Sequence, residues 1–341
     1  MMNYDRLTQI TEQFKGKRIV VCGDFFLDRY LWIDPDRAEI SVETGSTAHQ
    51  VITQTCAPGA AGTVVANLAA LGAEVICLGV IGDDGDGFML RRGLTNIGAD
   101  DHLLVVTPNR PTPTYTKPSI RHADGHVTEL ERLDIRSRDP LDDAIIQQIA
   151  KHLDTLADTV DAIVYADQMP EAGCGVIGSA IHDTIQQIAK THPQLPMFAD
   201  SRQRIHQFTN VTIKPNIYEA CNACGLDIHN TNASHAAITL AQRTHQPVVI
   251  TLGAAGVLVC EQNTCHQIDA ISVDQVIDVV GAGDSVMAAL AISRASGATL
   301  IESAEIAMFV AGVTVRQIGS TGTASVAQII EIAKRYQRLD A

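Results

Sequence analysis

Aromatic residues are scarce in this sequence. Phe, Trp and Tyr make up 4% of its 341 residues, although 46% of the residues are hydrophobic. The core must therefore be built mainly from aliphatic side chains, and abundant Ala, Ile and Val are typical of a parallel sheet covered by helices. The length suits one large α/β domain or two ordinary ones.

Positive charge is scarce too, with 25 Lys and Arg against 39 Asp and Glu and a formal net charge of −14. Because a phosphate backbone needs a basic surface, this balance argues against nucleic acid as a main partner. It leaves room for a nucleotide, which helix dipoles and a few local cations can hold.

Two targeting features are missing as well. No uninterrupted apolar run approaches the length of a membrane span, and residues 1–6 lack the charged-then-apolar pattern of a signal peptide. We therefore expect a cytoplasmic protein with no membrane partner. In that compartment the eight cysteines would be reduced and would serve mainly as packing residues.

One cysteine pair, Cys221-Asn-Ala-Cys224, has the spacing of half a zinc or redox site. No second pair completes it, because Cys260 and Cys265 have the wrong spacing. An isolated pair is a weak signal, so we expect no zinc site here.

The two common phosphate-binding loops are also missing. No Gly-x-x-x-x-Gly-Lys-Ser/Thr run occurs, and Gly281-Ala-Gly283 lacks the third glycine of a dinucleotide fingerprint, since Val286 occupies that place. A run of good helix formers comes directly after Gly281-Ala-Gly-Asp284 and continues as far as Arg294. A helix beginning near Gly283 would direct unpaired N–H groups and the positive end of its dipole at one spot, which stabilises an anion.

Asp284 lies in the first turn of that helix, with its carboxylate beside the anion-binding spot. The pair suits phosphoryl transfer, because the N–H groups hold developing phosphate charge while the carboxylate takes a hydroxyl proton. The simpler interpretation is a tight turn with an Asp near a helix start, which is the commoner meaning of a short glycine motif. The motif alone does not distinguish a phosphoryl-transfer site from a tight turn, so the rest of the sequence is needed.

Strands and helices alternate along most of the chain. The expected strands are at 18–23, 74–79, 162–166, 197–199, 211–214 and 247–252, and the main expected helices are at 141–157, 174–190, 300–317 and 326–337. Several strands end in an acid, as at Asp167 and Asp200, or in a glycine turn. This pattern predicts an α/β fold with a doubly wound, mostly parallel sheet flanked by helices, and a site at the strand carboxyl ends.

Two stretches, 29–58 and 110–134, interrupt the alternation with mixed polar and β-branched residues. We expect short antiparallel strands there that leave one domain, 1–341, on its ligand side. Together they predict a small β-sheet lid that excludes water from the site. The open edges of such a sheet favour a homodimer formed through the lid.

With these elements in place, the sequence resembles the ribokinase-like (PfkB) carbohydrate kinases. Asp278-Val-Val-Gly-Ala-Gly-Asp284 is close to that family's Asp-Thr-x-Gly-Ala-Gly-Asp signature. The family order is kept by Gly23-Asp-Phe-Phe-Leu-Asp28, Pro58–Gly62, Asn67–Ala73, Lys214–Glu219 and Thr251–Gly256. The segments at 23–30 and 130–134 look most like those of heptose 7-phosphate kinases. The resemblance implies a ribokinase-like fold and ATP- and Mg²⁺-dependent phosphorylation of a small-molecule sugar or sugar phosphate.

The resemblance also implies roles for residues at the acceptor side. Asp284 would be the base on the acceptor hydroxyl, and the anion hole would be formed by Gly281, Ala282 and Gly283. The residues that would meet sugar hydroxyls are Asp28, Gly59 and Asp167.

On the nucleotide side, Asn216 and Glu219 would organise Mg²⁺ and phosphate through water. The residues that would border the nucleotide are Thr251, Gly253 and Gly256. Asp278 and the carbonyl of Val280 match positions that hold a monovalent cation, which implies K⁺, and residues 317–323 match the other side of that site.

Three departures from the family pattern stand out. Ala60 replaces the second of two glycines near the sugar, Thr63 replaces an Asn, and Val279 replaces the Thr of the signature. The first two touch the sugar pocket, so the identity of the sugar stays open. Cations on or near the two excursions favour a substrate that already carries a phosphate. They are Arg37, Arg110, Lys117, Arg121 and Arg132.

Two alternative functions remain open. One is a kinase of the same fold that acts on a nucleoside or a free sugar. The other is a sugar or nucleotide sensor without catalytic activity. Retention of Asp284 together with Asn216 and Glu219 argues against the sensor, because a sensor has no need of the base.

Overall fold

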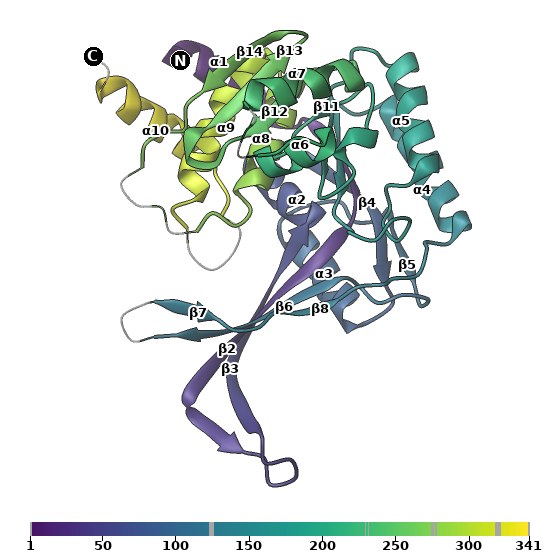
Figure 1. The fold of residues 1–341 in the computed structure, drawn as a ribbon, viewed down its shortest axis with the longest axis vertical. Coiled ribbons are helices and arrows are strands. Elements are labelled where there is room, and N and C mark those ends of the chain that lie inside the picture. Colours follow the sequence, from purple (N-terminus) through teal and green to yellow (C-terminus); the bar gives the residue numbers. More distant parts are fainter. Residues whose placement is uncertain are drawn as a thin grey trace.

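The computed structural model describes residues 2–122, 126–228, 230, 232–273, 276, 278–317 and 322–339. Its described strands form one large and one small sheet, and helices cover both faces of the large one (Figure 1). The large sheet has the order β14-β13-β12-β11-β10-β9-β1-β4-β5. Its strands are β1 (Arg18–Gly23), β4 (Glu74–Gly82), β5 (Leu104–Thr107), β9 (Ala162–Asp167), β10 (Met197–Ser201), β11 (Thr212–Ile213), β12 (Val248–Thr251), β13 (Val257–Glu261) and β14 (Thr264–Ile268).

The large sheet is parallel from β5 to β12 and antiparallel only at β13 and β14. The chain starts in the middle, at β1, and adds strands on either side of it. This is the doubly wound, mostly parallel sheet predicted from the alternation of elements.

Alternate side chains of the central strands point into two separate cores. Ile19 and Val21 of β1 join one core, while Val20 and Cys22 join the other. The first core is completed by α1 (Tyr4–Thr11), α2 (Ala61–Ala70), α3 (Gly85–Asn96), α8 (Ala282–Ala295), α9 (Leu300–Thr314) and α10 (Val326–Leu339). The second is completed by α4 (Asp143–Ala157), α5 (Ser179–Thr191), α6 (Ile217–Cys224) and α7 (Ala233–Thr244). Because both faces of each strand are covered, the strands are apolar throughout.

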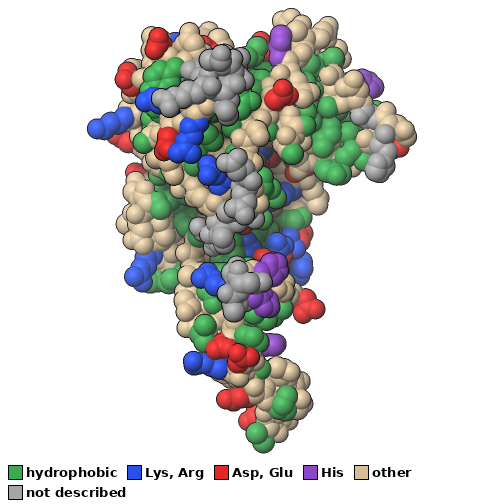
Figure 2. Space-filling view, turned by 90° about the vertical axis from the view of Figure 1, so that its left-hand side faces the viewer, with side chains coloured by type: hydrophobic (Ala, Val, Ile, Leu, Met, Phe, Trp, Pro, Cys, Tyr) green, Lys and Arg blue, Asp and Glu red, His purple; other side chains and the backbone are tan. Residues whose placement is uncertain are grey.

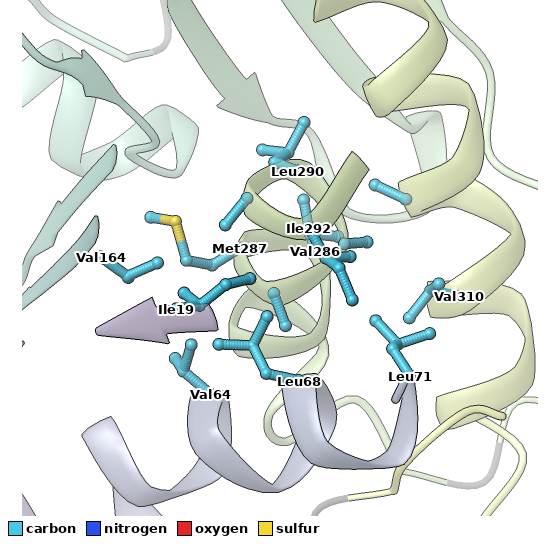
Figure 3. Close-up of a cluster of buried hydrophobic side chains, with 14 of the residues drawn as sticks. Ile19, Val64, Leu68, Leu71, Val164, Val286, Met287, Leu290, Ile292 and Val310 are labelled. Atoms are coloured by element: carbon cyan, nitrogen blue, oxygen red, sulfur yellow. The ribbon is translucent and has the colours of Figure 1, made fainter. Parts of the chain in front are cut away.

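Helix α8 lies deep in the first core. Residues 285–293 are all buried, and its side chains Val286, Met287 and Leu290 pack among residues of β1, α2 and α9 (Figure 3). A helix that is apolar on every side is stable only inside a core. Its position is therefore fixed by packing, and so is the place where it begins.

The two excursions pair with each other in one small sheet, in the order β3-β2-β6-β7 with β8 beside β6. Its strands are β2 (Phe25–Ile40), β3 (Thr47–Ala60), β6 (Thr114–Arg121), β7 (Val127–Glu129) and β8 (Leu133–Ile135). The prediction of a small second sheet is confirmed. The expectation of only short antiparallel strands is wrong, because β2 and β3 have 16 and 14 residues and β2 pairs with β6 in parallel.

The far part of β2 and β3 projects from the body as a two-stranded arm (Figure 1). Register shifts between Trp32 and Ile33, and again between Asp34 and Glu39, interrupt the pairing of the two strands. Such irregularities bend and twist a long hairpin, which allows it to continue beyond the body.

Asp86, in the first turn of α3, fixes the base of the small sheet. Its carboxylate forms an ion pair with Arg29 of β2 and accepts a hydrogen bond of 3.1 Å from the hydroxyl of Thr114 in β6. Both excursions are thus attached to the same helix at their roots.

Several boundaries differ from the expectations. Helix α5 starts at Ser179, not near 174, because residues 168–176 are needed to surround Asp24: its carboxylate accepts hydrogen bonds from the N–H groups of Gln168, Met169 and Val176. Helix α9 ends at Thr314, three residues earlier than expected. The other predicted helices near 141–157 and 326–337 are present.

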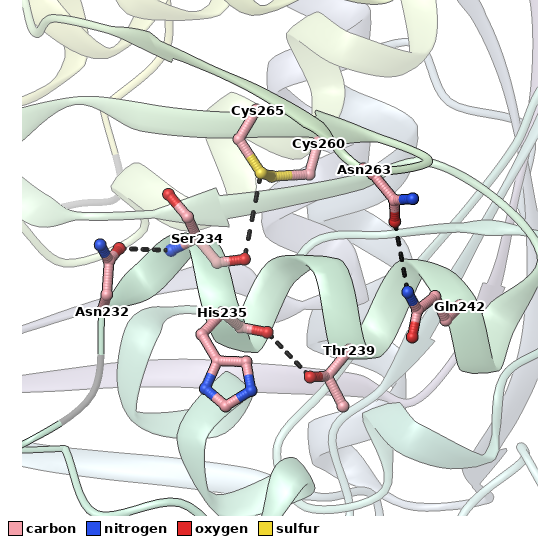
Figure 4. The surroundings of a disulfide bond; sticks show 8 residues. All are labelled: Asn232, Ser234, His235, Thr239, Gln242, Cys260, Asn263 and Cys265. Carbon is pink, nitrogen blue, oxygen red and sulfur yellow. Dashed lines mark hydrogen bonds between the residues drawn. A yellow bond between two sulfur atoms is a disulfide. The ribbon is translucent and has the colours of Figure 1, made fainter.

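The cysteines also require a correction. Cys260 and Cys265 face each other across the β13–β14 pair and form a disulfide, so the expectation that all eight are reduced is wrong (Figure 4). The hairpin register, which spacing alone does not reveal, brings them together. Cys221 and Cys224 are free thiols on α6, the first buried and the second half-buried. In the described part of the chain, no helix is long and apolar enough to cross a membrane.

Candidate active site

The start of α8 lies at the carboxyl edge of the large sheet, after a glycine turn. Gly281 precedes the helix with φ of 78°, in the left-handed region that favours glycine, and no side chain caps the helix. Among the described residues, the N–H groups of Gly283 and Asp284 meet no acceptor. Of the predicted anion-hole residues, Gly283 thus offers a free N–H group to an anion, whereas the N–H of Ala282 donates to the Val279 carbonyl at 3.2 Å. The Asp284 carboxylate lies in the same turn.

The side chain of Lys214, which follows β11, extends to the same turn. Its side chain is 4% exposed, and its Nζ lies 3.2 Å from Oδ2 of Asp200 at the end of β10. A Cβ on Gly283 would lie 3.5 Å from this Nζ, so the lysine sits directly against the glycine turn. Although burial opposes its charge, nearby carboxylates raise the pKa of Lys214 above its ordinary value; they belong to Asp200, Glu219 and Asp284.

Neither Lys214 nor Asp200 was assigned a role from the sequence. A signal was present, because Asp200 ends a predicted strand and Lys214 begins the Lys-Pro-Asn segment. What the sequence does not show is that β10 and β11 are neighbours, which brings the two side chains together.

The electrostatics of Asp284 are those of a base that works near neutral pH. Burial raises its pKa to about 7, and the negative charge of Asp200 acts in the same direction. Lys214 and Arg202 oppose the rise. An unperturbed Asp, with a pKa of about 3.9, would be a far weaker proton acceptor.

Asn216 and Glu219 form a capping box at the start of α6. The Asn216 side chain accepts a hydrogen bond of 2.9 Å from the Glu219 N–H, and Oε2 of Glu219 accepts one of 2.8 Å from the Asn216 N–H. Burial and the charge of Asp200 raise the pKa of Glu219. Oε1 of Glu219 has no partner among the described residues, so this pair can cap the helix and still offer an oxygen to a ligand.

The residues predicted to border the nucleotide lie beside this cap. Thr251 ends β12 and bridges to Asn216, and its N–H donates to the carbonyl of Pro215 at 3.0 Å. The short 3-10 turn Gly253–Ala255 follows. Gly256 closes the turn with φ of 92°, where a Cβ would lie 2.1 Å from the carbonyl oxygen of Ile268. Only glycine fits at that position.

Asp28 and Gly59 occupy neighbouring places on β2 and β3. A Cβ on Gly59 would lie 2.8 Å from Cγ of Asp28, so the carboxylate rests against the glycine backbone. Burial raises the pKa of Asp28, and Lys117 opposes the rise with its Nζ 3.5 Å from Oδ2. The charge of Asp28 in turn contributes to the raised pKa of Asp284, which places both carboxylates on the same side of the site.

Asp167 is placed differently from Asp28. It is 1% exposed and accepts hydrogen bonds from the Ser201 hydroxyl at 2.6 Å and from the Arg204 guanidinium. These contacts tie β9 to the end of β10. A role for Asp167 in binding a sugar hydroxyl stays a prediction.

The predicted cation site is partly within the described residues. Asp278 accepts a hydrogen bond of 2.8 Å from the Val280 N–H, and its own N–H donates to the Val315 carbonyl. On the other side, the Gln317 amide bonds to both the N–H and the carbonyl of Thr323. The intervening residues 318–321 lie outside the described part of the chain.

Comparison with known proteins identifies the family. The sequence matches the profile described as pfkB family carbohydrate kinase over residues 17–327, so the chain belongs to that family. The bifunctional protein HldE of Helicobacter hepaticus is 32% identical over 309 residues, or 90% of this chain. This chain spans 62% of that relative's length.

Solved structures confirm the ribokinase-like fold. A ribokinase of Arabidopsis thaliana, complexed with ribose and ATP, matches with a TM-score of 0.70 at 18% identity, covering 94% of this chain and 99% of the ribokinase. Phosphofructokinase-2 of Escherichia coli, in complex with potassium, matches with a TM-score of 0.70 at 17% identity, covering 95% and 100%. At such identities the likeness concerns the fold.

Replacing Asp284 by Asn should stabilise the protein at alkaline pH. The pKa of the folded state is raised from 3.8 to about 7, so this group favours folding only while it is protonated, and that contribution is lost as the pH rises through about 7. Asn keeps the neutral form at every pH. We expect the variant to gain about 1–3 kcal/mol in free energy of unfolding at pH 8 and little at pH 4, measured by urea denaturation.

The matched control is Asp83→Asn, which changes an exposed carboxylate and should give no gain at either pH. An equal gain for Asp284→Asn at pH 4 and pH 8 would show that the carboxylate is not destabilised by its surroundings.

Proposed function

We propose that this chain is an ATP-dependent kinase that phosphorylates a hydroxyl of a sugar or sugar phosphate. The observation that carries the proposal is the start of α8, where the Asp284 carboxylate, unpartnered N–H groups and the Lys214 ammonium meet in one turn. Membership of the pfkB family and the likeness to HldE support it. Among sugar phosphates, a heptose phosphate fits the resemblance best.

In this mechanism Asp284 accepts the proton of the sugar hydroxyl as that oxygen attacks the terminal phosphoryl group of ATP. The N–H groups of Gly283 and Asp284, together with Lys214, stabilise the charge that develops on the transferred group. One such donor is typically worth roughly 3–4 kcal/mol and a positioned base about 10²–10⁴-fold in rate. Asp28 would orient the sugar from the small sheet.

The carboxylates on the nucleotide side of the site fit Mg²⁺. Hard carboxylate oxygens suit that ion, and Glu219 retains an oxygen without a protein partner in the described chain, next to the Asp200 carboxylate. Bound Mg²⁺ would neutralise charge on the phosphates of ATP. Asn216 and Glu219 would hold it through water, and Gly253 and Gly256 would border the nucleotide.

The second candidate is a kinase of a free sugar or nucleoside. Ala60 favours keeping it, because this residue retains φ of 54°, in the region that favours glycine, and adds a Cβ at a position near the sugar where the family has a glycine. A panel of sugars, sugar phosphates and nucleosides assayed for ADP release separates the two. Sugar phosphates should give the highest kcat/KM, and higher values for ribose, fructose or adenosine would favour the second candidate.

Asp284→Asn should lower kcat by on the order of 10²-fold or more, because the amide keeps the shape of the helix start but cannot take a proton. Nucleotide binding should survive, which calorimetry with ADP can check. In the unmodified protein, kcat/KM should fall as the pH drops below about 7, because the base becomes protonated. A variant that keeps most of its activity would remove Asp284 from the mechanism.

We further propose that K⁺ raises activity through the site beside Asp278. A cation held by this carboxylate and the Val280 carbonyl would order the turn that precedes α8, and Gln317 already holds the opposite segment in place. Activity should be higher in KCl than in tetramethylammonium chloride, and Asp278→Asn should abolish the difference. Equal rates in the two salts would contradict the site.

A homodimer through the small sheet is the oligomeric state that we propose. Strands β3 and β7 are its edges, and hydrophobic side chains are exposed along the arm, the narrow lower part of Figure 2. Ile40 is 66% exposed, Val42 fully exposed and Ile52 56% exposed. Light scattering should give the mass of two chains, and Ile52→Glu should shift it towards one. A monomer at the concentrations used for assay would contradict the proposal.

A further inference from the structure

Three of the five cations named from the sequence as phosphate ligands already pair with carboxylates of the protein. Lys117 contacts Asp28 and the Tyr30 hydroxyl, and Arg37 pairs with Asp34 on the arm. Arg121 lies over the ring of Trp32. Arg110 donates from Nη2 to the Cys174 carbonyl at 2.6 Å, and its buried Nε and Nη1 have no hydrogen-bond partner among the described residues. Arg132 makes two hydrogen bonds to Asp134, of 2.6 and 2.9 Å. A cation paired with a carboxylate offers little to a second anion, so a phosphate needs partners besides Lys117, Arg37 and Arg132.

Two arginines outside that group lie near Tyr115 of β6, which stacks on Phe26 with ring centroids 4.7 Å apart. Arg136 directly follows β8, whose Asp134 lies opposite Tyr115. Arg202 donates to Gln168, the neighbour of Met169, which packs in one cluster with Phe26 and Tyr115. Burial raises the pKa of the Tyr115 hydroxyl, and three arginines oppose that rise. They are Arg132, whose guanidinium covers the ring, and Arg136 and Arg202.

Arg136 and Arg202 differ from Arg132 in having no tight acidic partner. The side chain of Arg136 is 20% exposed, and its Nη2 lies 3.7 Å from the Glu171 carboxylate, which is beyond hydrogen-bond distance. Arg202 donates from Nε to the neutral Gln168 side chain at 2.9 Å. Among the described residues no carboxylate lies within 4.0 Å of the Arg202 guanidinium. In an acidic chain, such cations are available for an anionic ligand.

Arg202 also connects this region to the candidate active site. Burial and Asp200 raise the pKa values of Asp284 and Glu219, and the positive charge of Arg202 lowers both. The arginine follows directly after strand β10, whose penultimate residue is Asp200. Its charge therefore acts on the residue proposed to take the proton of the acceptor hydroxyl and also on Tyr115 of the small sheet.

We propose that Arg136 and Arg202, with the hydroxyl of Tyr115, hold the phosphate that the acceptor sugar already carries. The inference rests on the proposed function and adds to it the residues that distinguish a phosphorylated sugar from a free one. A guanidinium can grip a phosphate through two parallel N–H groups, and two of them match its double charge. Stacking on Phe26 fixes the Tyr115 ring and with it the position of the hydroxyl.

The test compares Arg136→Gln and Arg202→Gln with Arg138→Gln as a matched control. Arg138 lies at the same 3.7 Å from the same Glu171 oxygen as Arg136, but its side chain is 77% exposed and it does not act on Tyr115. The measured quantity is the ratio of kcat/KM for a sugar phosphate to that for the same sugar without phosphate. Pairs to assay are sedoheptulose 7-phosphate with sedoheptulose and mannose 6-phosphate with mannose.

Each Gln variant should lower this ratio by about 10- to 100-fold, because a charge-assisted contact to the phosphate is lost. The loss should appear mainly in KM for the sugar phosphate, while KM for ATP stays as in the unmodified protein. Arg136→Lys should recover part of the ratio, since it restores charge without the paired N–H groups. Arg138→Gln should leave the ratio unchanged. Where the free sugar is not turned over, the ratio to compare is the inhibition constant of the free sugar divided by KM for the sugar phosphate.

Two results overturn the inference in distinguishable ways. If the unmodified protein phosphorylates a sugar phosphate and the ratio is unchanged in both Arg136→Gln and Arg202→Gln, these arginines do not read the phosphate and the proposed kinase function stands. An equal fall in the ratio for Arg138→Gln leads to the same conclusion, because general surface charge then explains the effect. If the unmodified protein prefers every free sugar to its phosphate, the sugar-phosphate assignment itself fails, and the inference fails with it.

Discussion

One buried positive charge holds the candidate site together. Lys214 is buried and lies among the carboxylates of Asp200, Glu219 and Asp284. Three negative charges at one edge of a sheet repel one another strongly once water is excluded, and the ammonium compensates for much of that repulsion. The compensation is incomplete, because the pKa of Asp284 still rises to about 7. Groups whose pKa values are displaced by burial and like charge are typical of sites that transfer protons.

The hydrophobic core makes this unfavourable arrangement possible. Helix α8 is buried from Ser285 to Ser293, so moving its N-terminus away from the carboxylates would disturb packing against β1, α2 and α9. Gly23 shows how closely the same edge of the sheet is packed, since a Cβ there would lie 2.2 Å from the Ala166 carbonyl oxygen. The stability of the body therefore offsets the electrostatic cost of the site.

Local signals in the sequence predicted most of the fold. Strand β1 and the start of α8 at Gly281 could be located because hydrophobic runs and glycine turns act over a few residues. The contact of Lys214 with Asp200 could not, because it depends on which strands become neighbours. The same limit applies to Arg202, whose charge reaches Asp284 only through the packing of distant segments. Local patterns thus locate the turn before α8 but not the cations that surround it.

The shared anchor at Asp86 determines how the small sheet can move. Arg29 and Thr114 stand on neighbouring strands and bind the same carboxylate, so the roots of both excursions are joined to α3 at one point. Neither excursion can rotate alone, and bending is easiest farther out, where the pairing shifts between Trp32 and Ile33. The small sheet therefore has a rigid base and a compliant outer arm, and movement of the arm leaves the geometry at the roots of β2 and β6 unchanged.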